Sequence, residues 1–251
     1  MDHEARAEAL RREADELLYD RGLLAMAERI GETFVAGSYF YDLMSWRDLD
    51  LYIDAPEVSI GDFFALGAEL TERLGGWKSF FTDTRSRSHD GPGARENKDP
   101  RRRLRGLYWG VRLGDTRRGA WKFDIWAVDR ATFELTVRQA HSFVQRLTER
   151  SRAAILRIKE PYWDGPRYPG TIRSWMVYEA VLDAGVGSIA EFEAYMADRG
   201  DPFGDPLLES YLTDAPAPNR AHGPGLTGTG PNGTELGDAG LGGLEPGSRG
   251  S

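Results

Sequence analysis

Two short motifs stand close together early in the chain: Thr-Phe-Val-Ala-Gly-Ser at 33–38 and, nine residues later, Asp-Leu-Asp-Leu-Tyr-Ile-Asp at 48–54. The apolar run 33–36 predicts a buried strand, and Gly37-Ser38 predicts a turn at its end. Strict alternation predicts a second strand over 48–54. One face of that strand carries Leu49, Leu51 and Ile53, and the other carries Asp48, Asp50, Tyr52 and Asp54.

A third carboxylate, Asp124, lies in the alternating segment 121–126, which places Lys122 and Trp126 on its face. Side chains at i and i+2 on a strand point the same way with Cβ atoms roughly 6.5–7 Å apart, so Asp48 and Asp50 repel each other unless a cation lies between them. With a carboxylate from a neighbouring strand they would suit two Mg²⁺ ions. The Gly-Ser turn offers backbone N–H groups to a phosphate. This combination indicates phosphoryl or nucleotidyl transfer.

These motifs resemble the nucleotidyltransferase superfamily named after DNA polymerase beta, over about residues 30–130. The resemblance implies that Asp48, Asp50 and Asp124 bind the metals, and that Asp124 helps to deprotonate an acceptor hydroxyl. It also implies that Gly37 and Ser38 hold the triphosphate of the donor.

The sequence departs from the family pattern after the Gly-Ser turn. Many members carry an arginine there, whereas this chain has Tyr39-Phe40-Tyr41. Phosphate would then be neutralised by Arg47, by Lys122, or by the arginines of the basic segment 85–105, which holds eight Lys and Arg residues. Two alternatives stay open for Lys122, a phosphate contact or an ion pair with Asp124. Trp126 is either a core residue or a stacking partner for a base or an acceptor ring.

The expected fold class is α+β: a small mixed sheet with helices on one side, then a C-terminal helical region and a disordered tail. Helices are predicted over about 4–30, 59–75, 130–158, 171–184 and 188–199, and further strands over 77–84, 105–113 and 120–128. The domain prediction is an α/β domain at 1–130, a helical region at 131–213 and a tail at 214–251. The tail holds 11 Gly and 5 Pro in 38 residues, too few apolar groups to offset its ordering entropy.

The composition excludes several kinds of protein and chemistry. The 251 residues carry a net charge of −8, which disfavours a uniformly basic nucleic-acid binder. The absence of cysteine excludes disulfides and thiolate chemistry. No membrane span or signal peptide is recognised, so a cytoplasmic location is expected.

The leading interpretation is an Mg²⁺-dependent enzyme that moves a nucleoside monophosphate from an NTP, with ATP among the candidates, to a hydroxyl and releases pyrophosphate. A small molecule, such as an antibiotic, or a protein is the expected acceptor, and nucleic acid is not favoured. The alternative is a non-catalytic nucleotide- or partner-binding module of the same fold, of the toxin–antitoxin type. A nucleotide-sugar glycosyltransferase fits less well, because only 47 residues precede the Asp-Leu-Asp motif.

Overall fold

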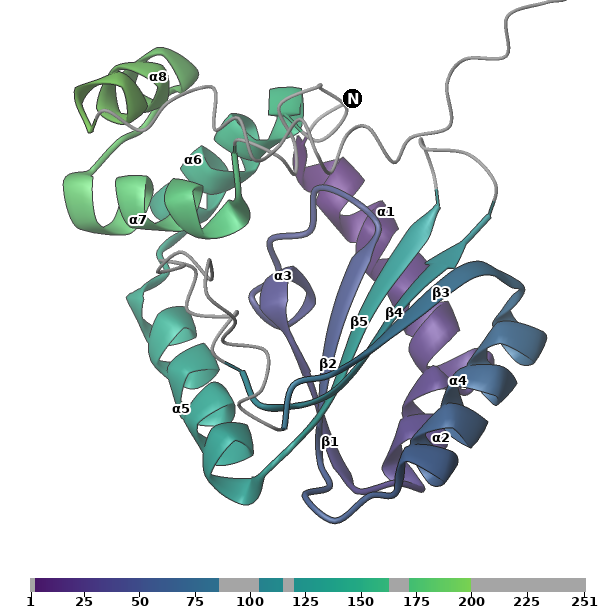
Figure 1. Ribbon diagram of the computed structural model, residues 1–251. Coiled ribbons are helices and arrows are strands. Elements are labelled where there is room, and N and C mark those ends of the chain that lie inside the picture. The colour runs from purple at the N-terminus through teal and green to yellow at the C-terminus, as the bar shows by residue number, and fades with distance from the viewer. Residues whose placement is uncertain (1–2, 86–103, 115–119, 163–171, 200–251) are drawn as a thin grey trace, which may run out of the picture. The chain divides into compact units, whose positions relative to one another are not determined.

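The computed structural model describes residues 3–85, 104–114, 120–162 and 172–199. Its centre is a five-stranded sheet in the order β1-β2-β5-β4-β3 (Figure 1). The strands are β1 (Glu32–Ala36), β2 (Asp48–Asp54), β3 (Gly76–Asp83), β4 (Gly106–Leu113) and β5 (Trp121–Val128). β2 and β5 pair in parallel and the other neighbours pair antiparallel, so the expected mixed sheet is confirmed.

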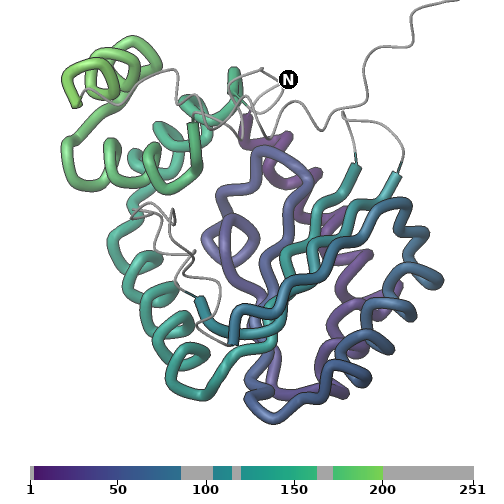
Figure 2. The backbone as a smooth tube through the Cα atoms, in the orientation of Figure 1, coloured from purple at the N-terminus to yellow at the C-terminus, as the bar shows by residue number. Residues whose placement is uncertain are grey.

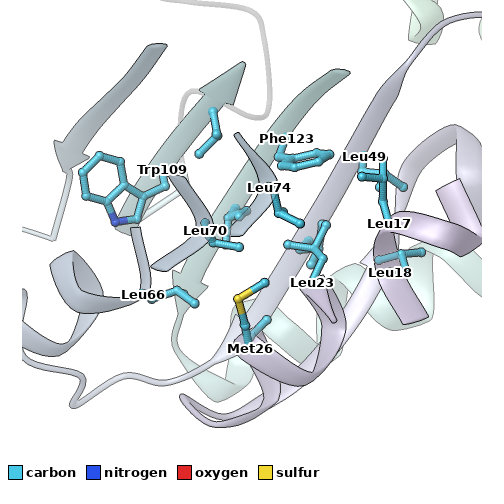
Figure 3. Close-up of a cluster of buried hydrophobic side chains, with 14 of the residues drawn as sticks. Leu17, Leu18, Leu23, Met26, Leu49, Leu66, Leu70, Leu74, Trp109 and Phe123 are labelled. Carbon is cyan, nitrogen blue, oxygen red and sulfur yellow. The ribbon is translucent and has the colours of Figure 1, made fainter. Parts of the chain in front are cut away.

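One face of the sheet is covered by helices from the N-terminal third of the chain. These are α1 (His3–Asp15), a π-helical turn (Glu16–Asp20), α2 (Leu23–Glu28) and α4 (Ile60–Leu74). Their apolar side chains meet those of β2, β4 and β5 in the main core (Figure 3), which includes Leu17, Leu18, Leu23, Met26, Leu49, Leu66, Leu70, Leu74, Trp109 and Phe123. Because Leu49 points into this core, its neighbours Asp48 and Asp50 face the other side of the sheet.

The opposite face is covered in part by α5 (Arg130–Arg146), which packs against β1 and β2. Phe133 of α5 joins Ala36, Tyr52 and Val128 in a small buried cluster. Helices α1, α2 and α4 therefore lie on one side of the sheet, as expected. Helix α5 additionally covers one end of the other face.

A second core lies among α6 (Glu149–Lys159), α7 (Ser174–Ala184) and α8 (Ile189–Asp198), with a 3₁₀ turn at Glu160–Tyr162. Figure 2 traces the backbone from the sheet through α5 into these helices. The core also takes in Ala7 of α1 and Leu43, which precedes β2. All of the described residues belong to one compact unit. The division at 130/131 stays a prediction.

Two of the predicted helices are interrupted. The helix expected over 4–30 is broken at Gly22, whose φ of +78° is left-handed and cannot continue a right-handed helix. The helix expected over 130–158 is broken at Leu147 and Thr148, which have extended backbone. The Thr148 hydroxyl accepts from the Ser151 N–H and starts α6. Each break is marked in the sequence by a single residue, Gly22 or Thr148, within a stretch whose periodicity predicts a helix.

Two predictions fall outside the described residues: most of the basic segment 85–105, and the tail 214–251. Where the chain is described, no helix has the length and apolar character needed to cross a membrane.

Candidate metal and phosphate site

The three aspartates predicted as metal ligands meet on the face of the sheet opposite the main core. The parallel register of β2 and β5 places Asp50 beside Asp124, and Asp48 lies two residues before Asp50 on the same face. One carboxylate oxygen from each residue lies within 4.8 Å of the others, and all three side chains are half-buried. Such a group of hard oxygen ligands suits a divalent cation such as Mg²⁺.

Gly37 lies directly against one of these carboxylates. Its φ is +66°, and a Cβ built on it would lie 2.1 Å from Asp50 Oδ2. Position 37 therefore requires glycine for both its conformation and its space. The single helical turn α3 (Gly37–Phe40) begins there, so its first N–H groups start beside the carboxylates.

The aromatic residues that replace the expected arginine hold this turn in place. The Tyr39 hydroxyl donates to Asp15 of α1 at 2.7 Å, and burial raises the pKa of that hydroxyl. Phe40 packs edge-on against Phe34 of β1, with ring centroids 4.9 Å apart. Tyr41 stacks on Phe143 of α5 at 4.2 Å. Consecutive side chains thus attach the turn to α1, β1 and α5.

Lys122 lies among the carboxylates. Its Nζ is 2.5 Å from Asp124 Oδ2 and 3.3 Å from Asp48 Oδ1. Burial alone lowers the pKa of Lys122, but Asp48, Asp124 and Asp50 together raise it above its ordinary value. Of the two alternatives left open by the sequence, this structure contains the ion pair.

The other two residues predicted to bind nucleotide have different surroundings. Arg47 forms a two-pronged ion pair with Glu13 of α1, through Nε at 2.6 Å and Nη2 at 2.8 Å. Its guanidinium would have to leave Glu13 to reach a phosphate, and its phosphate-binding role stays a prediction. Ser38 is half-buried in α3, and its carbonyl accepts from the Leu43 N–H at 2.8 Å.

Tyr108 is a site residue that sequence reasoning missed. Its hydroxyl donates to Asp124 Oδ1 at 2.8 Å from the neighbouring strand β4. Burial and the adjacent Asp124 raise the pKa of this hydroxyl, so it remains a donor at neutral pH. Alternation along β4 was the available signal, but the register that brings Tyr108 to Asp124 depends on a hairpin that the sequence does not fix.

Lys159 is a second residue that was missed. It is 1% exposed, and its Nζ donates to the Leu43 carbonyl at 2.7 Å and lies 4.3 Å from the centre of the Trp46 ring. Burial lowers the pKa of Lys159 to about 7, although Asp48 and Asp50 act in the opposite direction. A lysine from α6 thus supports the segment that leads into β2.

Two observations support a divalent cation at this place. Asp48 Oδ1 is buried and accepts no hydrogen bond from any residue in the described ranges, although Lys122 lies near it. Asp48, Asp50 and Asp124 also bring three negative charges around the Lys122 ammonium in a partly buried position. The donor set and its unsatisfied oxygen therefore fit Mg²⁺.

A scan against models of protein families gives no match, and a search of curated proteins gives none. Several solved structures are similar over 69–72% of this chain. A cytoplasmic RNA terminal U-transferase has 16% identity and a TM-score of 0.40, over 51% of its own length. A mutant Cid1 poly(U) polymerase bound to MgATP has 20% identity and a TM-score of 0.42, over 50% of its length.

Terminal uridylyl transferase 4 from Trypanosoma brucei, with bound UPU, has 15% identity and a TM-score of 0.38, over 59% of its length. The chain thus spans about half the length of the solved structures it resembles.

Proposed function

We propose that this protein is a nucleotidyltransferase that moves a nucleoside monophosphate from an NTP to a hydroxyl group and releases pyrophosphate. The observation that carries the proposal is the meeting of Asp48, Asp50 and Asp124 beside a Gly37 turn that leaves no room for a side chain. The donor triphosphate would lie at the N–H groups of Gly37 and Ser38. The expected acceptor is a small molecule or a protein.

Asp48, Asp50 and Asp124 would hold Mg²⁺, which supplies charge neutralisation at the phosphate oxygens and lowers the pKa of the acceptor hydroxyl. The acceptor oxygen forms a new bond to the α-phosphorus, and the bond from that phosphorus to the bridging oxygen breaks. The electron pair leaves with pyrophosphate. Asp124 would take the acceptor proton at Oδ2 once Lys122 has left that oxygen, because its Oδ1 already receives the Tyr108 hydroxyl.

Lys122 has a place in this scheme as a mobile counter-charge. In the described structure its ammonium neutralises Asp48 and Asp124. Binding of the metal and the triphosphate would release it from the carboxylates towards the phosphate oxygens. Its two alternative roles would then be two stages of one cycle.

The test is a titration of each NTP with and without Mg²⁺, following thermal stability and pyrophosphate release in the same wells. We expect a rise in Tm only when metal and nucleotide are both present, because binding to the native state stabilises it. Asp50→Asn should abolish that rise. Asp198→Asn, an exposed position near the end of α8, is the control and should keep it. No shift with any nucleotide would overturn the proposal.

The same Lys122 contacts also favour a second candidate, a non-catalytic module. The Lys122 ammonium, 2.5 Å from Asp124, can balance the charge of the carboxylates in place of a metal ion. Metal-dependent NTP binding without pyrophosphate release, with every acceptor tried, would select this alternative.

A further inference from the structure

The chain between α3 and β2 joins the two halves of the candidate site, because α3 begins at the phosphate turn and β2 carries two of the carboxylates. α3 ends at Phe40 and β2 begins at Asp48, so residues 41–47, here called the connecting segment, belong to neither element. Three consecutive residues of this segment are buried: Leu43, Met44 and Ser45. Backbone groups that are buried outside a helix or a sheet need partners from elsewhere in the chain.

Helix α6 supplies such partners from one side. Arg152 and Lys159 are separated by close to two full turns of α6, so their side chains leave the helix in the same direction. Arg152 donates to Asp42 Oδ2 through Nη2 at 2.6 Å and through Nε at 3.1 Å. Asp42 has φ +56°, a left-handed conformation that few residues other than glycine adopt. The ion pair therefore holds the start of the connecting segment in an uncommon backbone conformation.

Lys159 holds the connecting segment at two points. It is 1% exposed, and its Nζ donates to the Leu43 carbonyl at 2.7 Å. The same ammonium lies 4.3 Å from the centre of the Trp46 ring, where the negative face of the indole attracts a cation. The Tyr178 hydroxyl of α7 lies 3.4 Å from Nζ. Burying a cation is costly unless such groups replace the lost water, so the ammonium and the Trp46 ring hold each other in place.

Trp46 connects Lys159 to one of the predicted metal ligands. Its indole Nε1 donates to Asp48 Oδ2 at 3.4 Å. The other carboxylate oxygen, Oδ1, is buried and accepts no hydrogen bond from the residues that the structure describes, although Nζ of Lys122 lies 3.3 Å away. Donors placed behind a metal ligand fix its orientation and raise its affinity for the metal. The indole therefore holds Asp48 by one oxygen and leaves the other available to a cation.

We propose that Lys159 and Trp46 are positioning residues of the metal site: the ammonium fixes the indole, and the indole fixes Asp48 with Oδ1 available to the cation. In this role neither residue touches the metal or the nucleotide. The proposal rests on the proposed function and deepens it, because it extends the metal site into the C-terminal helices. A lysine that only filled the core would stabilise the fold without changing the affinity for the metal.

The test is a double-mutant cycle on the affinity for Mn²⁺, measured on the full chain without NTP by the EPR signal of free Mn²⁺. Mn²⁺ takes the same oxygen ligands as Mg²⁺. Trp46→Phe keeps an aromatic ring and removes the N–H, whereas Lys159→Met removes the ammonium. Each should weaken binding about tenfold, the usual loss for a partner behind a metal ligand. Because the two residues act in series, the double variant should also lose about tenfold rather than about a hundredfold.

Two further variants separate positioning from general stability. Lys159→Arg keeps a cation that can stack on the Trp46 ring, and it should bind Mn²⁺ within about threefold of the wild type. Ile158→Val shortens a fully buried side chain of the same helical core, so it should lower the Tm and leave the affinity for Mn²⁺ unchanged. If Lys159→Met fails to fold, Lys159→Gln replaces it, because glutamine keeps an N–H donor for the Leu43 carbonyl but has no charge, and it should show the same loss.

Wild-type affinity for Mn²⁺ in Lys159→Met or in Trp46→Phe would overturn the proposal, and so would losses that multiply in the double variant. An equal loss in Ile158→Val would assign the effect to a weakened core and overturn it as well. A wild type that binds no Mn²⁺ would overturn the proposed function together with this inference. Unchanged binding in every variant would overturn this inference alone.

Discussion

Gly37 and Asp50 lie so close together that the Asp50 carboxylate occupies the space a Cβ on residue 37 would need. That Cβ would lie 2.1 Å from Asp50 Oδ2. The contact arises because β1 and β2 pair antiparallel, with Ala36 opposite Asp50, so the chain leaves β1 directly over that aspartate. A turn suited to bind phosphate and a carboxylate suited to bind metal are thereby fixed against each other.

Gly37→Ala should damage this contact in two ways. The left-handed conformation costs about 1 kcal/mol for a residue with a Cβ, and the clash forces Asp50 or the turn to move. We expect a lower Tm and loss of the stabilisation by Mg²⁺ and NTP. Gly75→Ala is the control, because Gly75 has φ +77° and no atom within 4 Å of the place that a Cβ would take. Equal behaviour of both variants would contradict the steric explanation.

Asp50→Asn should stabilise the protein slightly when no metal is added. Asp48, Asp50 and Asp124 lie close together around the Lys122 ammonium, so removing one of the three negative charges relieves repulsion. We expect a gain of only about 0.5 kcal/mol or less in urea unfolding with EDTA, because Asp50 also attracts the ammonium groups of Lys122 and Lys159. With Mg²⁺ and NTP the order should reverse, and the wild type should be the more stable. The same order in both conditions would argue against a metal at Asp50.

Lys122→Gln should destabilise the protein without metal by about 1.5–3 kcal/mol, since hydrogen bonds to charged groups contribute on this scale. Asp48 and Asp124 would lose their ammonium partner. Added Mg²⁺ should then raise the Tm of the variant by more than it raises the Tm of the wild type. Arg138→Gln, an exposed position of α5, serves as the control. An unchanged response to Mg²⁺ would remove Lys122 from the metal site.

Tyr108→Phe should lower kcat about tenfold with little change in the KM for NTP, since a hydrogen bond to a charged group contributes about 1.5–3 kcal/mol. The variant keeps the aromatic ring and loses only the hydroxyl that donates to Asp124. An unchanged kcat would show that this hydroxyl does not assist Asp124.

Lys159 should make stability depend on pH. Its pKa is lowered from 10.5 to about 7 in the folded state, so between pH 7 and 10 the unfolded chain binds more protons than the native one. Stability then rises with pH across this window, by at most about 1.4 kcal/mol per unit. Urea unfolding at pH 7, 8 and 9 should show the rise in the wild type and a smaller rise in Lys159→Met. Parallel curves would show that Lys159 does not titrate there.

Local patterns were enough to predict the strands and the meeting of the three aspartates. Alternation around Leu49 and Phe123 determines which residues face the core, and Ser59 with Gly75 determines the ends of α4. The turn at Gly37 could be predicted because a glycine directly after a buried strand usually marks a turn.

The contacts that tune the site could not be predicted, because they join residues far apart in the chain. Tyr108 reaches Asp124 across a hairpin, Arg47 pairs with Glu13 across 34 positions, and Lys159 reaches Leu43 across 116. No local periodicity in the sequence predicts any of these pairs. The break at Thr148 was missed for the opposite reason, since one capping residue is a weak signal within two helical patterns.

The buried bond from Lys159 to the Leu43 carbonyl has a consequence for how such chains can diverge. Leu43 also lies in the core of α6, α7 and α8, while the residues that follow it lead into Asp48. A recombinant that inherited its sheet from one ancestor and its helices from another would leave either a buried ammonium or a buried carbonyl without its partner. The two segments are therefore expected to be inherited together.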